Sequence, residues 1–200
     1  MTAVTPDPAL SPRYSEALQF CFEIHSRQRR KGGSVPYVSH LLAVSALVME
    51  QGGSEDEAIG ALLHDSAEDC GGRPMLEQVR QRFGEAVAAI VEGCTDSFAE
   101  TPDKKEDWRP RKERYLKHLR EADRSTQLVA ACDKFHNLSN TVRDLRAGGP
   151  AVWSKFNTGA ADQVWYYSRC TEIVEAAGLP IAKELRRELD ELITLAGEAG

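Results

Sequence analysis

The sequence predicts an all-α fold. Apolar residues recur at helical spacing through most of the chain, and the segments that carry them are separated by clusters of Gly, Pro and Ser. No segment shows the sustained alternation of apolar and polar residues, rich in β-branched types, that is typical of a strand. The chain is therefore expected to form helices joined by short turns, without a β-sheet.

The first predicted helix begins at Ser11-Pro12. This pair has the pattern of an N-cap followed by proline at the first helical position, and the apolar spacing continues through Ile24. Residues 30–36 combine charge with Gly32, Gly33 and a proline, which predicts a loop.

The second helix is predicted over residues 36–50, where Gly52-Gly53 follows it. Ser54 and Glu57 have the spacing of a capping box, in which each side chain bonds the backbone N–H of the other residue. A third helix is expected to begin there and to reach about Asp69.

The rest of the chain continues in the same way. Further helices are predicted over residues 75–83, 85–96, 108–121, 125–146 and 163–177, and a last one over about 180–198. Residues 98–107 are polar and are expected to form a loop, and the run 147–150 (AGGP) must break the chain between two helices. Because no composition shift marks a boundary, residues 1–200 are predicted to form one domain, with a core over about 12–178.

Composition places the chain among ordinary globular proteins, with 42% hydrophobic and 28% charged residues. The formal net charge of -6 argues against nucleic acid as a partner, and no apolar run is long enough to span a membrane. The opening segment lacks the pattern of a signal peptide. The five cysteines include no CxxC pair, which favours free thiols in a reducing compartment. We therefore expect a cytoplasmic protein.

The segment 58–69 (AIGALLHDSAED) gathers a histidine and three carboxylates. On one helix, at ~100° per residue, His64, Asp65, Glu68 and Asp69 would fall within an arc of about 140°. Carboxylates are disfavoured at the C-terminal end of a helix, so this group calls for a compensating cation, either a metal ion or an arginine. For Glu68 and Asp69 alone, a solvated helix end is the alternative.

Two more residues of ligand type lie on predicted helices. His40 is on the core side of the second helix, where a hydrogen-bonded core histidine is the alternative to a ligand. Asp133 and Asn137 share a polar face opposite an apolar stripe, and this pattern by itself predicts solvent exposure. Imidazole and carboxylate groups hold catalytic divalent cations, but the pattern does not show that the segments meet.

An isolated histidine, a later His-Asp pair and a distant aspartate, all on predicted helices, resemble the HD phosphohydrolase superfamily. The finer resemblance is to the hydrolase domain of the RelA/SpoT family and to the single-domain, Mesh-type small alarmone hydrolases. It covers about residues 15–175 and is carried by the segments HSRQRRKGGSVPYVSH (25–40), GALLHDSAED (60–69), FGEAVAAIVEGCTDS (83–97), ACDKFHN (131–137), WSKFN (153–157) and WYY (165–167). It implies a compact multi-helix HD-domain fold.

The resemblance also implies an activity: metal-dependent hydrolysis of guanosine 3′,5′-bis(diphosphate), written (p)ppGpp, at the 3′ ester with release of pyrophosphate. The implied metal is a divalent ion, expected to be Mn²⁺, and its implied ligands are His40, His64, Asp65 and Asp133. Glu68 and Asp69 are expected to position and deprotonate the attacking water. Support of the metal ligands is the alternative role for both residues, more so for Asp69.

The expected substrate contacts are Arg30, Lys31, Asn137 and Tyr166. Guanidinium groups suit both stacking and phosphate contact, although a solvated loop is the alternative for Arg30 and Lys31. Core packing is the alternative for Tyr166. The remaining histidines are assigned to structure: His25, His118 and His136.

Other functions stay open on the sequence. One alternative is an HD-type phosphatase that acts on another phosphorylated nucleotide or on NADPH, since the sequence does not show pocket shape. A non-catalytic nucleotide sensor and a helical interaction scaffold are the others, and neither requires the full set of expected ligands. The sequence does not predict the oligomeric state.

Overall fold

The computed structural model describes residues 9–98 and 106–197. In these two ranges the secondary structure is helical, with an isolated β-bridge between Arg29 and Pro36 and no strand. The all-α prediction is therefore confirmed. No helix within the same ranges is both long and apolar enough to cross a membrane.

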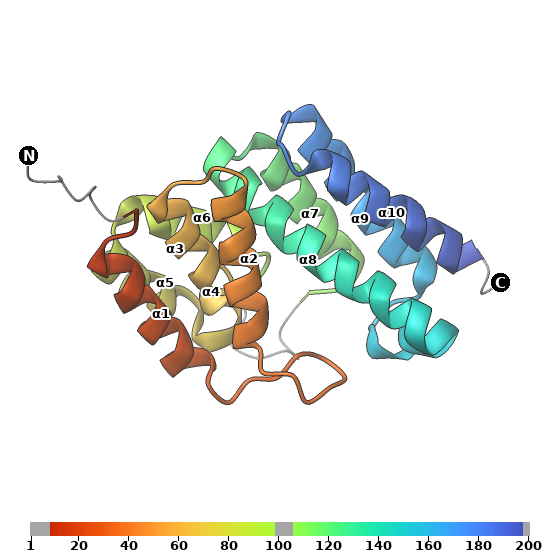
Figure 1. Ribbon diagram of the computed structural model, residues 1–200, viewed down its shortest axis with the longest axis horizontal. Helices are drawn as coiled ribbons and strands as arrows, with labels where there is room; N and C mark the ends of the chain where they lie inside the picture. Colours follow the sequence, from red (N-terminus) through yellow and green to blue (C-terminus); the bar gives the residue numbers. More distant parts are fainter. Residues whose placement is uncertain (1–8, 99–105, 198–200) are drawn as a thin grey trace, which may run out of the picture.

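The first six helices lie together on one side of the molecule (Figure 1). They are α1 (Pro12–His25), α2 (Val38–Glu50), α3 (Glu55–Leu63), α4 (Ser66–Cys70), α5 (Gly72–Phe83) and α6 (Glu85–Cys94). Their apolar faces enclose a first hydrophobic cluster, which includes the buried side chains Phe20, Leu62 and Val79. This burial is the main force that holds the short helices α3, α4 and α5 in place.

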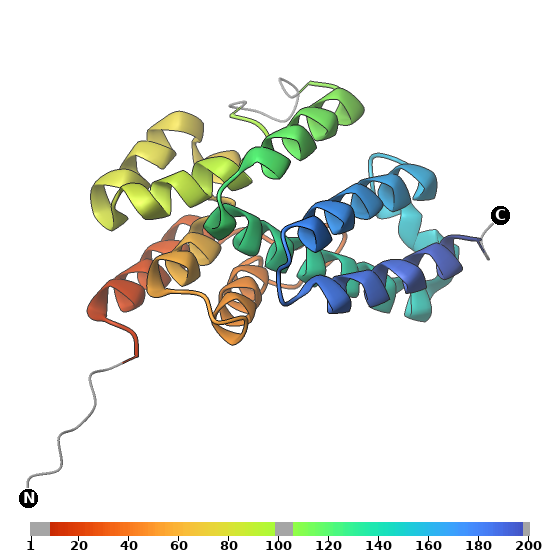
Figure 2. The same ribbon diagram turned by 90° about the horizontal axis from the view of Figure 1, so that it is seen from above.

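The later helices form the other side, as the view from above shows (Figure 2). They are α7 (Trp108–Glu121), α8 (Arg124–Gly148), the 3₁₀ helix η2 (Gly149–Lys155), α9 (Ala160–Ala176) and α10 (Ala182–Gly197). A second hydrophobic cluster includes Leu138, Tyr167 and Leu189. The long helix α8 contacts α2, α3 and α6 as well as α9 and α10, so it carries its side chains to the junction of the two halves.

The structure corrects the third predicted helix, which was expected to run without interruption to about Asp69. Helix α3 ends at Leu63, His64 and Asp65 form a turn, and α4 begins at Ser66. The His64 Nδ1–H donates to the carbonyl oxygen of Ala61, the acceptor that Asp65 N–H would use in a continuous helix. The capping box at the start of α3 is present as predicted, with Ser54 and Glu57 each bonded to the backbone of the other.

The other boundaries differ from the predicted ones by a few residues. Helix α6 ends at Cys94 rather than at Asp96, and α8 continues to Gly148. The predicted break then follows at Gly149, whose φ of +60° is a conformation that favours glycine. Most of the loop predicted over residues 98–107 falls on residues 99–105, which are outside the described residues.

Candidate metal centre and active site

Three segments bring the four expected metal ligands together at the junction of the two halves. His40 comes from the first turn of α2, His64 and Asp65 from the turn between α3 and α4, and Asp133 from α8. The His40 Nε2 atom lies 3.1 Å from Asp133 Oδ1, and the His64 Nε2 atom lies 3.0 Å from Asp65 Oδ2. The crossed distances are 3.7 Å from His40 Nε2 to Asp65 and 3.6 Å from His64 Nε2 to Asp133.

The hydrogen bonds of the two histidines orient their Nε2 atoms toward the carboxylates. Because a carbonyl only accepts, the bond from His64 to Ala61 fixes the proton on Nδ1. The Nδ1 atom of His40 lies 2.7 Å from Nδ1 of His136. Both Nε2 atoms are buried and have no hydrogen-bond partner among the described residues. Two buried imidazole nitrogens directed at two carboxylates fit a metal ion, because the ion satisfies each lone pair.

Ligand atoms of His40, His64 and Asp65 lie within 4.8 Å of one another, so this group could hold a metal ion. Asp133 adds a second carboxylate on the opposite side. The apolar stripe on its helix predicted exposure for Asp133, and that prediction is wrong: the residue is 5% exposed. The polar face of α8 is buried because α2 and α3 pack against it.

The charges of these groups depend strongly on one another. Burial disfavours charge on Asp133, but Lys134 and the hydrogen bonds with His40 and His64 hold its pKa well below the usual range. Burial likewise opposes charge on His64, yet the carboxylates of Asp65 and Asp133 raise its pKa well above the usual value. Burial lowers the pKa of His40. A proton on His64 thus occupies the place in which a cation would interact with the same carboxylates.

A small polar cavity of about 180 Å³, here named the inner chamber, lies beside these ligands. Its charged lining comprises five carboxylates, Asp65, Glu68, Asp69, Asp96 and Asp133, and three cationic side chains, Arg30, Lys112 and Lys134. The excess of two negative charges matches the charge of one divalent cation. The donor set and this charge balance therefore both fit the metal that the sequence predicts.

Several hydrogen bonds support the ligands. Tyr37 Oη donates to Asp65 Oδ2 at 2.6 Å, and the Asn137 side-chain amide donates to Asp133 Oδ1 at 2.6 Å. The Lys134 Nζ atom lies 2.5 Å from Asp133 Oδ2. Each bond fixes the orientation of one carboxylate, as residues around metal sites commonly do.

The structure places Glu68 and Asp69 on α4, where both line the inner chamber. The Gln28 side-chain amide donates to Asp69 Oδ2 at 2.7 Å, which ties this carboxylate to the loop that follows α1. Both acids therefore lie beside the ligand group, as the sequence led us to expect, although on a separate helix.

A second cavity of about 780 Å³, the outer pocket, adjoins the inner chamber. Arg30, Tyr37 and Asn137 line both spaces. The Arg30 guanidinium donates to Asn137 Oδ1 at 2.7 Å and lies over the Tyr37 ring, 5.6 Å from its centroid. Lys31 also lines the outer pocket, and its Nζ donates to Asn157. Three of the four predicted substrate contacts therefore lie at the outer pocket.

Tyr166, the fourth predicted contact, is placed elsewhere. Its ring is 5% exposed and lies 5.9 Å from the ring of Trp108, and it lines neither the inner chamber nor the outer pocket. Its neighbour Tyr167 lines the outer pocket instead. The structure thus gives Tyr166 the packing role that the sequence left as its alternative.

Sequence reasoning missed four residues at the site: Tyr37, Lys112, Lys134 and His136. His136 was assigned to structure, yet its ring contacts the buried ring of His40. Its position three residues after Asp133 placed it on the same helix turn, which was an available signal. Nothing in the sequence connects Lys112, on α7, with ligands on other helices.

The comparisons with known proteins agree with this site. The family described as "HD domain" matches residues 17–160. The guanosine-3′,5′-bis(diphosphate) 3′-pyrophosphohydrolase MESH1 of Xenopus tropicalis is 36% identical over 143 residues, which cover 70% of this chain and 73% of that protein. MESH1 of Drosophila melanogaster is 31% identical over 148 residues, 72% of this chain and 76% of that protein.

Solved structures show the same fold. One, titled "A metazoan ortholog of SpoT hydrolyzes ppGpp and plays a role in starvation responses", has a TM-score of 0.72 and 26% identity, and the match covers 98% of this chain and 99% of that one. A crystal structure from Listeria monocytogenes EGD-e has a TM-score of 0.67 and 26% identity, covering 78% and 99%. The family match, the similar sequences and the shared fold lead to one conclusion: this chain belongs to the HD domain family.

Proposed function

We propose that this protein is a divalent-metal-dependent (p)ppGpp 3′-pyrophosphohydrolase, which uses water to release pyrophosphate from the 3′ position of guanosine 3′,5′-bis(diphosphate). The observation that carries the proposal is the pair of adjoining cavities. The inner chamber offers ligands and cations to a diphosphate, and the outer pocket has room and an aromatic side chain, Tyr167, for a nucleoside. The names of the relatives point to the same substrate.

In this proposal His40, His64, Asp65 and Asp133 hold the metal, and Mn²⁺ is the ion we expect. When bound, such an ion polarises the phosphate and lowers the pKa of water. The unpartnered Nε2 atoms of the two histidines support these assignments. Tyr37 and Asn137 keep the two carboxylates in place.

The other residues bind substrate and move a proton. Glu68 accepts the proton of the attacking water as general base, and Asp69, held by Gln28, orients that water. Lys112 and Lys134 line the chamber where the 3′-diphosphate would lie and offer it positive charge. Arg30 bridges the two cavities, so its guanidinium can contact the ribose-phosphate portion, while Lys31 and Asn137 lie beside it.

The proposal includes a cytoplasmic, single-domain enzyme whose partner is a small nucleotide rather than a nucleic acid. Free thiols at Cys21, Cys70, Cys94, Cys132 and Cys170 support a reducing location. The net charge of -6 disfavours binding to a polyanion such as RNA.

The test is hydrolysis of (p)ppGpp by the purified protein with and without Mn²⁺, with GDP and pyrophosphate resolved by chromatography. His64→Ala removes a ligand, and Glu68→Gln removes the base with little change in size. We expect Mn²⁺-dependent release of pyrophosphate that both substitutions abolish. No turnover by protein that demonstrably binds Mn²⁺ would refute this substrate, and other phosphorylated nucleotides and NADPH would then be assayed.

A further inference from the structure

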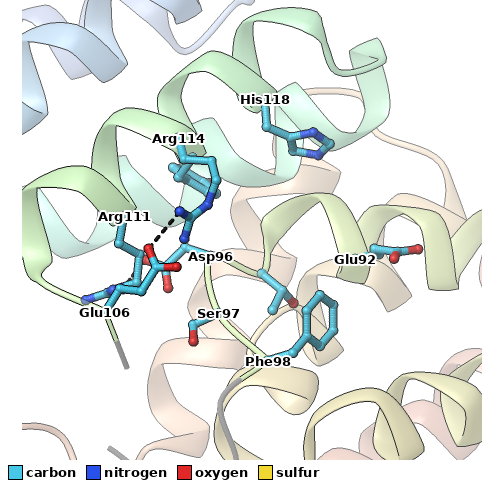
Figure 3. Close-up of a pocket in the computed structure, with 10 residues that line it drawn as sticks. Glu92, Asp96, Ser97, Phe98, Glu106, Arg111, Arg114 and His118 are labelled. Atoms are coloured by element: carbon cyan, nitrogen blue, oxygen red, sulfur yellow. Dashed lines mark hydrogen bonds and ion pairs between the residues drawn. The ribbon is translucent and has the colours of Figure 1, made fainter. Parts of the chain in front are cut away.

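A third cavity, of about 620 Å³, lies between α6 and α7 and is here named the side cavity (Figure 3). Arg111, Arg114 and His118 line it from α7, and Asp96 and Phe98 line it from the segment after α6. The three residues of α7 are spaced at i, i+3 and i+7, so they share one face of that helix. None of the roles assigned above uses this cavity.

The side cavity and the inner chamber share a wall. Asp96 and Tyr115 line both spaces, and Tyr115 is only 4% exposed. The Oδ2 atom of Asp96 accepts a hydrogen bond from Lys112 Nζ at 2.5 Å and another from Arg111. Lys112 lines the inner chamber, whereas Arg111 lines the side cavity. One carboxylate oxygen therefore lies between a cation of the chamber and a cation of the side cavity.

Three polar atoms at this wall are buried and unpaired. Asp96 Oδ1, Arg111 Nε and Tyr115 Oη have no hydrogen-bond partner among the described residues. Buried polar groups are nearly always satisfied, so three at one place indicate that a polar species belongs there. Two of them, the guanidinium and the phenol, donate hydrogen bonds and suit an oxyanion.

The positions of the products explain why an anion would pass this wall. With the 3′ end of a nucleotide at the metal ligands, its nucleoside fills the outer pocket and occupies the opening formed by Arg30, Tyr37 and Asn137. The pyrophosphate forms on the inner side of that nucleoside. Of the other cavities in the described part of the chain, the side cavity shares lining with the chamber, through Asp96 and Tyr115.

We propose that the side cavity is the exit route for pyrophosphate and that Arg111 and Arg114 bind the leaving diphosphate there. This inference rests on the proposed function. Arg114 is available for exchange, because its present partner is Glu106 in an ion pair in which both side chains are 57% exposed. Exposed pairs of this kind are weak, so an incoming dianion can replace the carboxylate.

The experiment compares the wild-type protein with two variants of the cavity. Arg114→Gln removes a cation that lines the side cavity but not the inner chamber, and His118→Trp narrows the cavity from an exposed position on the same helix. Lys117→Gln is the matched control, because Lys117 is an exposed basic residue of α7 that lines neither of these cavities. The readouts are calorimetric binding of inorganic pyrophosphate to the Mn²⁺-loaded protein, single-turnover hydrolysis and steady-state kcat.

We expect Arg114→Gln to bind pyrophosphate about tenfold more weakly, the loss of one charge-assisted hydrogen bond. His118→Trp should lower kcat by about tenfold with a burst of GDP, since release then limits turnover. Single-turnover rates should equal those of the wild type and of Lys117→Gln. If both variants bind pyrophosphate and turn over like Lys117→Gln, the inference is wrong.

The two proposals fail in different ways. A wild-type protein that does not hydrolyse (p)ppGpp refutes the proposed function, and the side cavity is then judged by pyrophosphate binding alone. Equal binding by the wild type and Arg114→Gln refutes the exit route, whether or not the wild type is active.

Discussion

His64 donates its Nδ1 hydrogen to the carbonyl oxygen of Ala61, 2.8 Å away, and thereby presents Nε2 to Asp65 and Asp133. This bond serves both the fold and the site. It occupies the carbonyl at the end of α3, where the chain turns, and it fixes the tautomer that a metal ligand requires. The break in the helix and the formation of the metal centre are thus one structural event.

The first prediction concerns this ligand. His64→Ala is expected to weaken Mn²⁺ binding by more than about 100-fold, because it removes a ligand where loss of a supporting residue alone costs about 10–100-fold. Titration calorimetry of the metal-free protein measures the change. His118→Ala, an exposed histidine on α7, is the control and should bind as the wild type does. Equal Mn²⁺ affinity of both variants would remove His64 from the ligand set.

The second prediction separates the base from the ligands. Glu68→Gln is expected to reduce kcat by about 10²–10⁴-fold, the usual contribution of a general base, while Mn²⁺ binding persists. Glu77→Gln provides the control, because that carboxylate lies on α5 and pairs with Arg80 on the surface. Loss of Mn²⁺ binding in Glu68→Gln would instead assign Glu68 to support of the metal.

The third prediction tests the support of Asp65 by Tyr37. Tyr37→Phe removes only the hydroxyl that donates to Asp65 Oδ2, and we expect Mn²⁺ affinity to fall about tenfold. Tyr14→Phe removes a comparable bond, between Tyr14 and Ser45, and should leave the affinity unchanged. An affinity loss of the same size in both variants would mean that general destabilisation, rather than orientation of Asp65, is responsible.

The fourth prediction concerns the pH dependence of stability. Burial disfavours charge on Asp96, but Lys112 and Arg111 outweigh it and lower the pKa of its carboxyl from 3.8 to about 2. Because the folded pKa lies below the unfolded one, the resulting stability is fully present above pH 3.8 and is lost as the pH falls through about 2. The pH-dependent stabilisation is about 2 kcal/mol.

Urea unfolding of the wild type and of Asp96→Asn at a series of pH values measures this difference. The gap in the free energy of unfolding should be largest near neutral pH and should narrow as the pH falls toward 2. Asp162→Asn is the control, since its pair with Arg109 is exposed and should contribute less than about 1 kcal/mol. A gap that stays constant with pH would contradict the low pKa.

The sequence by itself determined the fold class and most helix positions. Helical periodicity and capping are local properties, so the start of α1 at Pro12 and the limits of α7 at Trp108 and Glu121 were predicted correctly. The ligand types were also readable, since imidazole and carboxylate groups announce their chemistry wherever they lie. The resemblance to the HD family supplied the combination of His40 with the distant Asp133.

Only the tertiary structure decided which side chains share a space. The face of α8 that carries Asp133 reads as exposed because periodicity describes one helix at a time, and its burial follows from the packing of α2 and α3 against it. For the same reason, no pattern connected Lys112 with the ligands or distinguished Tyr167 from Tyr166. Which polar groups face one another depends on long-range packing of apolar surfaces, which local sequence does not specify.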